Sequence, residues 1–253
     1  MTATMTRRRS GLTRREFARA AALTAAFTIV PRHVLGGAGY AAPSETLNLA
    51  LIGAGGHGAF LINEVVSYSK GLAGQLGGVN VVAVCDVDER RAHETVGHNH
   101  PAITDTNDAG FKRFPSARRY NDFRKLFDWE EKNIDAAVVA TPDHTHIPAS
   151  VMAMRMGKHV YCEKPLGHNI HEVRVAAEVA RQNGVATQMG IGNHSSETFR
   201  RVVELILAGA VGDVREVHAW CDHNWGNRIR PKETPPVPEH LNWDLWLGPA
   251  PYR

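Results

Sequence analysis

The 253-residue chain is long enough for one large domain or one and a half ordinary ones, and its 43% of hydrophobic residues exclude a chain disordered throughout. The formal net charge is +3, but residues 1–42 hold seven arginines against one glutamate, so the remainder carries −3. A mildly acidic body gives no reason to expect nucleic acid as a partner.

Residues 1–42 are predicted to be an export signal followed by a connector. Arg14 and Arg15 precede an uncharged, alanine-rich stretch at residues 20–30. This stretch is too short for a membrane-spanning helix, which needs about 20 apolar residues. The arginine pair, with Phe17 two places on, resembles the twin-arginine signal of bacteria. We therefore expect export by the twin-arginine machinery to the periplasm, with no stable membrane span. The alternative is an amphipathic surface helix, which the uncharged stretch disfavours.

A glycine-rich turn follows the first predicted strand, an apolar run at residues 47–52. It reads G-A-G-G-H-G and matches the G-x-G-x-x-G of dinucleotide-binding turns. Gly53 permits the tight turn, Gly55 lets the backbone approach a pyrophosphate, and Gly58 lets the next helix pack closely. The phosphates would meet free N–H groups at that helix N-terminus. The predicted dinucleotide contacts in this turn are Gly53, Gly55, Gly56, His57 and Gly58.

A second buried strand is predicted at residues 79–85, and it ends at Asp86. A carboxylate there can accept both hydroxyls of the adenosine ribose and would repel a 2′-phosphate, which favours NAD over NADP. Asp86 follows the last glycine of the turn by 28 residues, more than the usual spacing of about 20, because of a glycine-rich insertion. Arg90 and Arg91 could meet a phosphate, so NADP stays open, and Asp86 could also be a plain polar strand end.

Strands and helices continue to alternate along the chain. Further strands are predicted at 134–140, 159–162 and 185–189, and helices at about 59–69, 149–156 and 170–183. This alternation predicts an α/β fold, a Rossmann-type, doubly wound parallel sheet, over residues 43–192. The three cysteines are far apart, and Cys85 and Cys162 fall in apolar runs, so we expect buried thiols and no disulfide framework.

Polar groups follow three of these strands. Residues 141–146 read T-P-D-H-T-H, residues 163–165 read E-K-P, and residues 190–194 read G-I-G-N-H. Ligands of such sheets sit beyond the carboxyl ends of the strands, so we expect these groups to point into one crevice. His144 and His146 form an H-x-H that could bind zinc, but nothing completes a ligand shell, so we expect no metal.

The glycine-rich turn, T-P-D-H-T-H and E-K-P, in this order, resemble the Gfo/Idh/MocA family of glucose–fructose oxidoreductase, inositol dehydrogenase and relatives. The resemblance runs from about residue 47 to the end of the chain. It implies an NAD(P)-dependent oxidoreductase that transfers a hydride between a nicotinamide cofactor and a sugar or cyclic polyol. Two alternatives stay open: an NAD-dependent glycoside hydrolase of the same fold, which works by transient oxidation and elimination, and a fragment that binds the dinucleotide without turnover.

The resemblance also implies roles for single residues. Lys164 would lie beside the nicotinamide and the reacting hydroxyl and would act in catalysis, with His146 as a second catalytic candidate. The bond from this lysine to Pro165 is often cis in relatives. The implied cofactor contacts beyond the glycine-rich turn and Asp86 are Thr141, Pro142, His144, Glu163, Lys164 and Asn193.

The last part of the chain is expected to begin a second domain at residue 193. Residues 214–220 alternate like a strand exposed on one face. In the family this is the first strand of an α+β, mostly antiparallel substrate domain, and relatives continue well beyond it. We therefore expect a chain truncated before its catalytic region is complete, and a homo-oligomer is left open for the full-length parent.

Overall fold

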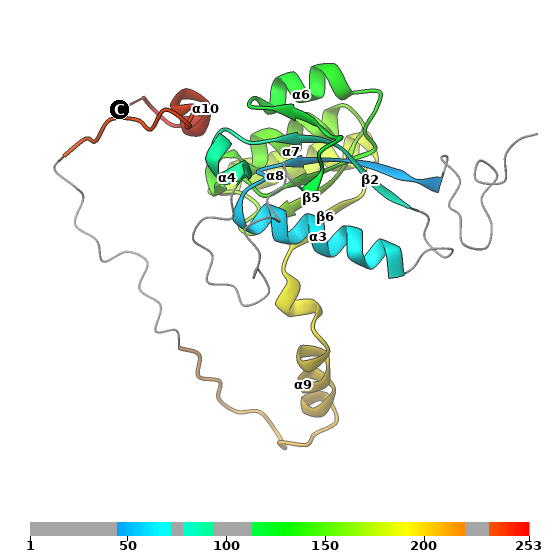
Figure 1. Cartoon of the computed structure of the whole chain (residues 1–253). Coiled ribbons are helices and arrows are strands. Elements are labelled where there is room, and N and C mark those ends of the chain that lie inside the picture. The colour runs from blue at the N-terminus through cyan, green and yellow to red at the C-terminus, as the bar shows by residue number, and fades with distance from the viewer. Residues whose placement is uncertain (1–44, 72–77, 94–112, 221–232, 253) are drawn as a thin grey trace, which may run out of the picture.

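The computed structural model describes residues 45–71, 78–93, 113–220 and 233–252 (Figure 1). Six parallel strands form one sheet in the order β3-β2-β1-β4-β5-β6. Their bounds are β1 Leu47–Ile52, β2 Val79–Cys85, β3 Arg118–Tyr120, β4 Ala136–Val139, β5 His159–Glu163 and β6 Thr187–Gly190. This order confirms the predicted Rossmann-type sheet, because the chain winds outward from β1 in one direction and then from β4 in the other.

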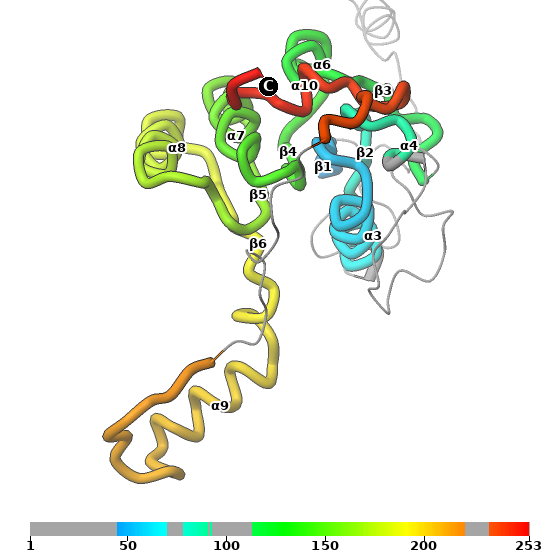
Figure 2. Tube along the Cα trace, turned by 90° about the vertical axis from the view of Figure 1, so that its left-hand side faces the viewer, coloured from blue at the N-terminus to red at the C-terminus, as the bar shows by residue number. Residues whose placement is uncertain are grey.

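Helices α3 to α8 lie between the strands in sequence and cover both faces of the sheet, whereas α9 and α10 follow the last strand. Their bounds are α3 Gly56–Gly71, α4 Glu89–His93, α6 Phe123–Glu130, α7 His146–Arg155, α8 Ile170–Asn183, α9 Glu197–Leu207 and α10 Trp243–Leu247. Side chains of α3 and α4 pack in one buried cluster, and those of α6, α7 and α8 pack in the other, on the opposite face (Figure 2). The inner strands β1, β2 and β4 read as apolar runs because both of their faces are largely buried.

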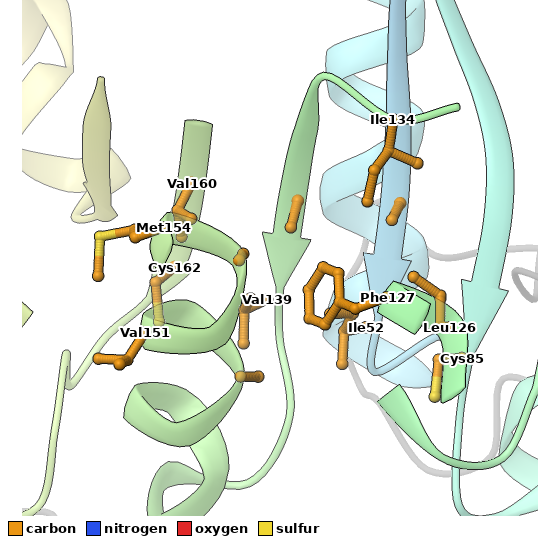
Figure 3. Close-up of a cluster of buried hydrophobic side chains, with 14 of the residues drawn as sticks. Ile52, Cys85, Leu126, Phe127, Ile134, Val139, Val151, Met154, Val160 and Cys162 are labelled. Atoms are coloured by element: carbon orange, nitrogen blue, oxygen red, sulfur yellow. The ribbon is translucent and has the colours of Figure 1, made fainter. Parts of the chain in front are cut away.

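The larger core cluster lies between the sheet and the helices α6 and α7 (Figure 3). Phe127 and Leu126 of α6 are fully buried beside Ile52 of β1, and Val151 and Met154 of α7 lie next to β5. Helix ends are fixed locally. The Asn169 side chain accepts a hydrogen bond from the Glu172 N–H at the start of α8, and Gly184 ends that helix in the left-handed conformation.

The short edge strand β3 was not predicted, because Arg118-Arg119-Tyr120 is not an apolar run. It is held by Glu130, a buried carboxylate that accepts hydrogen bonds from the Tyr120 hydroxyl at 2.5 Å and from Arg118 at 2.9 Å. Asn133 donates a third at 2.8 Å. Burial alone would raise the pKa of Glu130, but these three donors outweigh it and lower the pKa.

The prediction of a strand at residues 214–220 was wrong, since the segment is exposed and has no regular secondary structure. Alternation marks a strand only where a partner strand supplies hydrogen bonds. The unpredicted helix α9 lies just before it, and Figures 1 and 2 both show α9 away from the sheet. None of its residues is buried, and apolar side chains such as Phe199 and Val202 are exposed.

Both described cysteines lie within the core, as expected. Cys85 and Cys162 are 2% and 1% exposed, and neither forms a disulfide. Burial raises the pKa of both thiols, that of Cys162 to about 11, so the reactive thiolate is scarce near neutral pH. Cys221 lies outside the described residues.

We therefore predict that Cys85 and Cys162 resist thiol reagents in the native protein at pH 8. A Cys221→Ser variant should show less than about 0.1 reactive thiol per chain with a chromogenic disulfide reagent before denaturation, because opening of the core must precede reaction. Denaturant should release both thiols at once. Rapid labelling of either cysteine under native conditions would contradict the buried placement.

Candidate dinucleotide site

The glycine-rich turn is packed so closely against β4 that side chains are excluded. A Cβ on Gly53 would lie 2.5 Å from the Ala140 carbonyl oxygen, and Gly53 also has φ +90°. A Cβ on Gly58 would lie 1.8 Å from the Gly53 carbonyl oxygen. Both contacts are impossible for any other residue without backbone movement. The sequence interpretation of these two glycines therefore agrees with the structure, and α3 begins within the turn, at Gly56.

Asp86 lies where β2 ends and holds the glycine-rich turn. Its Oδ2 accepts hydrogen bonds from the backbone N–H groups of Ala54 at 2.7 Å and Gly55 at 3.0 Å, and its Oδ1 accepts one from Asp88 at 2.9 Å. Burial raises the pKa of Asp86, and the three backbone donors partly offset that increase. Asp86 is therefore more than a plain polar strand end, because its carboxylate ties β2 to the turn.

A cleft of about 760 Å³ opens at the carboxyl edge of the sheet. It is centred where β1 and β4 lie side by side, the point at which the strand order reverses and where ligands of such sheets bind. Of the sequence-predicted residues, those that line it are Gly53, Gly55, Gly56, His57, Asp86, Thr141 and Pro142. Gly58 lies beneath the turn.

The segment after β4 gives the cleft an unsatisfied polar group. Thr141 lines the cleft, and its buried Oγ1 has no hydrogen-bond partner among the described residues. Such an atom is costly unless a ligand or water supplies a partner. A bound dinucleotide, with its many hydroxyl and phosphate oxygens, fits this position.

His146 is placed differently from the catalytic group that the resemblance implied. Its side chain is 1% exposed at the start of α7. Nδ1 lies 2.7 Å from the Pro165 carbonyl oxygen, and Nε2 lies 2.8 Å from that of Thr141. Because both ring nitrogens face backbone carbonyls, His146 ties the ends of β4 and β5 together. Its ring does not line the cleft, so the geometry gives it a positioning role.

Glu163 links β5 to the glycine-rich turn. It is 6% exposed, and its Oε1 lies 3.3 Å from Nε2 of His57 and accepts a hydrogen bond from the Tyr161 hydroxyl at 3.3 Å. Burial, followed by the charge of Glu163, raises the pKa of Tyr161 to about 12. A Cβ on Gly190 would lie 2.1 Å from the same carboxylate oxygen, so the glycine that ends β6 leaves room for it.

Lys164 and Asn193 stand farther from the cleft than the crevice prediction implied. Lys164 is exposed at the end of β5, before a cis bond to Pro165, and Asn193 is exposed in the short 3₁₀ helix after β6. Neither lines the cleft. The sheet order places β5 and β6 one and two strands beyond β4, so the strand ends share an edge but do not converge on one point.

Among the described residues, His144 contacts a backbone carbonyl and is not part of a cluster of metal ligands. Its Nε2 lies 2.7 Å from the carbonyl oxygen of Trp246, which belongs to the last described segment of the chain. The described residues contain no group of three or more histidine, cysteine, aspartate or glutamate side chains suited to a metal.

Within the described residues, no helix has the length and apolar character needed to cross a membrane.

Two segments that line the cleft were missed from the sequence. Residues 121–124, at the start of α6, carry only ordinary turn and helix-capping residues and gave no signal. The second segment contains α10 and contributes Trp243 and Trp246. Its tryptophan-rich composition was visible, but its position depends on contacts with residues more than one hundred positions earlier.

Comparison with known proteins identifies the family. A model of the oxidoreductase family with an NAD-binding Rossmann fold, Gfo/Idh/MocA, matches residues 47–191. The chain belongs to the Gfo/Idh/MocA family. The resemblance carried by the three motifs is thus confirmed, together with the prediction of an NAD-binding fold.

Curated Gfo/Idh/MocA relatives are longer than this chain. An inositol 2-dehydrogenase of Salmonella typhimurium is 25% identical over 68% of this chain and 45% of its own length. A mouse trans-1,2-dihydrobenzene-1,2-diol dehydrogenase is 31% identical over 43% of the chain and 32% of its own. A glycosyl hydrolase family 109 protein of Saccharopolyspora erythraea is 31% identical over 67% and 34%. The chain therefore spans less than half the length of these relatives.

Solved structures show the same fold. An NAD-binding oxidoreductase from Klebsiella pneumoniae superimposes with a TM-score of 0.52 at 25% identity, over 66% of this chain and 40% of that one. A scyllo-inositol dehydrogenase from Lactobacillus casei, solved with NAD(H) and scyllo-inositol, gives a TM-score of 0.51 at 22% identity, over 66% and 43%.

Asp86 offers a test of cofactor selectivity. Asp86→Asn keeps an oxygen for the turn but removes the charge, so NADP⁺ affinity should rise relative to NAD⁺ by about tenfold, because repulsion of the 2′-phosphate is lost. Asp86→Ala should also weaken NAD⁺ binding by about tenfold or more, since hydrogen bonds to a charged group are lost. Isothermal titration with both cofactors measures this. Unchanged affinity ratios in both variants would contradict the role given to Asp86.

Proposed function

We propose that the protein is an NAD(H)-dependent oxidoreductase that transfers a hydride between the nicotinamide and a CH–OH group of a sugar or cyclic polyol. The observation that carries the proposal is the cleft at the sheet's switch point, which is lined by the glycine-rich turn and by Asp86. NAD⁺ when bound supplies the hydride acceptor. The inositol dehydrogenases among the relatives support a polyol as substrate.

Each group of the chain has a distinct task in this proposal. Backbone N–H groups at the start of α3 bind the pyrophosphate, while the Ala54 and Gly55 N–H groups of the turn stay bonded to Asp86. The Thr141 hydroxyl forms a hydrogen bond with the dinucleotide. His146 and Glu163 hold the ends of β4 and β5 in place. Lys164, which is exposed directly after β5, donates a hydrogen bond to the reacting oxygen and stabilises charge that develops there.

The decisive experiment is a steady-state assay of the complete protein with NAD⁺ and a panel of sugars and cyclic polyols. A dehydrogenase accumulates NADH in proportion to oxidised substrate. Failure of every sugar and polyol to reduce NAD⁺, with binding of NAD⁺ intact, would overturn the proposed reaction but leave the dinucleotide site standing.

A glycoside hydrolase is the second candidate, and the similarity to a glycosyl hydrolase family 109 protein favours it. Such a reaction would oxidise the sugar transiently, eliminate the aglycone, add water to the unsaturated sugar and return the hydride. The same assay separates the two candidates, since a hydrolase releases the aglycone from a glycoside while NADH does not accumulate.

We also propose that the protein is exported. The support is Arg14-Arg15 ahead of the uncharged residues 20–30, all of which lie outside the described residues. The route carries folded proteins, which suits a domain whose cofactor is loaded before export.

Replacing both arginines tests the export route. The double variant Arg14→Lys, Arg15→Lys should leave the precursor in the cytoplasm, because the twin-arginine receptor recognises the guanidinium pair. Cell fractionation followed by immunoblotting measures the distribution, and Arg7→Lys, Arg8→Lys is the matched control. Export that is unaffected by the double change at 14 and 15 would refute this route.

Lys164 should act on turnover more than on cofactor affinity. In the complete protein, Lys164→Met should lower kcat by roughly a hundredfold to a thousandfold, because the lost donor acts on charge present only in the transition state. The dissociation constant of NAD⁺ should stay within about threefold, a change below roughly 1 kcal/mol. Lys158→Met, on the loop before β5, is the matched control and should leave both quantities unchanged. Turnover that survives in Lys164→Met would make the lysine structural.

A further inference from the structure

Residues 238–249 lie within the last described part of the chain and fold back onto the carboxyl edge of the sheet. We call this segment the strap. Figures 1 and 2 both show α10, within the strap, beside the sheet domain and far from α9. The strap includes Leu241, Trp243 and Leu245 among the residues that line the cleft. It therefore forms a wall of the same cleft that contains the glycine-rich turn.

One end of the strap is anchored beside Asp86. Leu241 forms an isolated antiparallel bridge with Asp88. The Glu89 N–H donates to the His240 carbonyl at 3.0 Å, and the Asn242 N–H donates to the Val87 carbonyl at 2.9 Å. Nδ1 of His240 lies 3.0 Å from the Asp88 carboxylate. These contacts fix the strap to the residues that directly follow β2.

The other end is anchored after β4. The Trp246 carbonyl lies 2.7 Å from Nε2 of His144, and the two rings meet edge to face at 5.4 Å. Leu247 is 8% exposed, and a Cβ on Gly248 would lie 2.8 Å from the Thr145 side chain, so the strap packs tightly there. The strap thus crosses the carboxyl edge of the sheet from β2 to β4 and lies along the cleft beside Asp86.

We propose that the strap completes the adenosine half of the dinucleotide site, with Trp243 as an aromatic contact for the adenine. This rests on the proposed NAD(H) site. The Trp243 and Trp246 rings are stacked at 5.0 Å with an angle of 8°, which holds the Trp243 indole in a fixed orientation at the cleft wall. A flat aromatic ring beside the ribose-binding carboxylate is suited to stack on a purine.

The neighbouring charges fit this assignment. Asp244 lies near enough to Arg124 to raise the pKa of that guanidinium, after the larger effect of Asp122. Asp86, Asp88 and Asp244 line the cleft, and so does Arg124, which forms an ion pair with Asp122. The carboxylates can accept hydrogen bonds from ribose hydroxyls.

The test compares Trp243→Ala, Trp243→Phe and Trp129→Ala in the full chain. Trp129 is an exposed residue of α6 that does not line the cleft, and it serves as the matched control. Trp243→Ala should raise the dissociation constants of NAD⁺ and of ADP-ribose by the same factor, about tenfold, because stacking on the adenine is lost in both. Trp243→Phe should recover most of the affinity, and Trp129→Ala should bind like the parent.

Each other outcome overturns the inference. Unchanged affinity in Trp243→Ala, with thermal unfolding like that of the parent, would show that the strap is not part of the site. Tighter binding would show that the strap competes with the cofactor. Weaker NAD⁺ binding with unchanged ADP-ribose binding would move the contact to the nicotinamide half. If the parent chain binds neither ligand, the proposed function falls together with the inference, whereas the first three outcomes leave it intact.

Discussion

The arrangement of the site depends on the close backbone approach between the glycine-rich turn and the end of β4. Gly53 and Gly58 leave no room for a Cβ because the Ala140 backbone and the turn itself already fill that space. This contact sets how far α3 lies from the sheet, and it brings the N-terminus of α3 to the switch point. A wider turn would move the backbone N–H groups away from any ligand that lies between β1 and β4.

Asp86 is the second fixed point, and its placement joins stability to binding. A half-buried carboxylate is stabilised when donors compensate its lost hydration, and here the donors are backbone N–H groups of the turn and of the residues after β2. The carboxylate therefore organises the turn before any ligand arrives. Glu163 repeats this arrangement on the other side, where it joins β5 to His57 of the same turn. The turn is thus held between two acidic strand ends.

The parts predictable from sequence were those that depend on local pattern. The strands at 47–52 and 79–85 were predicted to the residue because both faces are largely buried, and α8 was predicted to end where Gly184 stops it. The strand β3 was not predicted because its sequence is not an apolar run. Its side chains instead form hydrogen bonds with the buried Glu130. The prediction of a strand at 214–220 was wrong because an alternation of apolar and polar residues does not show whether a partner strand is present. The strap could not be found because its anchors, Asp88 and His144, are 152 and 102 residues away from their partners.

The polar residues after β4, β5 and β6 follow a similar pattern in the sequence, but the sheet places them at different distances from the cleft. Thr141 follows β4 at the switch point and lines the cleft, while Lys164 follows β5 one strand farther out and is exposed. Between them, the two ring nitrogens of His146 lie 2.7 and 2.8 Å from the carbonyl oxygens of Pro165 and Thr141, so this side chain links the two positions. In the proposed function, the dinucleotide would lie between β1 and β4, and Lys164 would lie at the margin of that site. A substrate would bind at this margin, and the contact through His146 would relate the positions of the two.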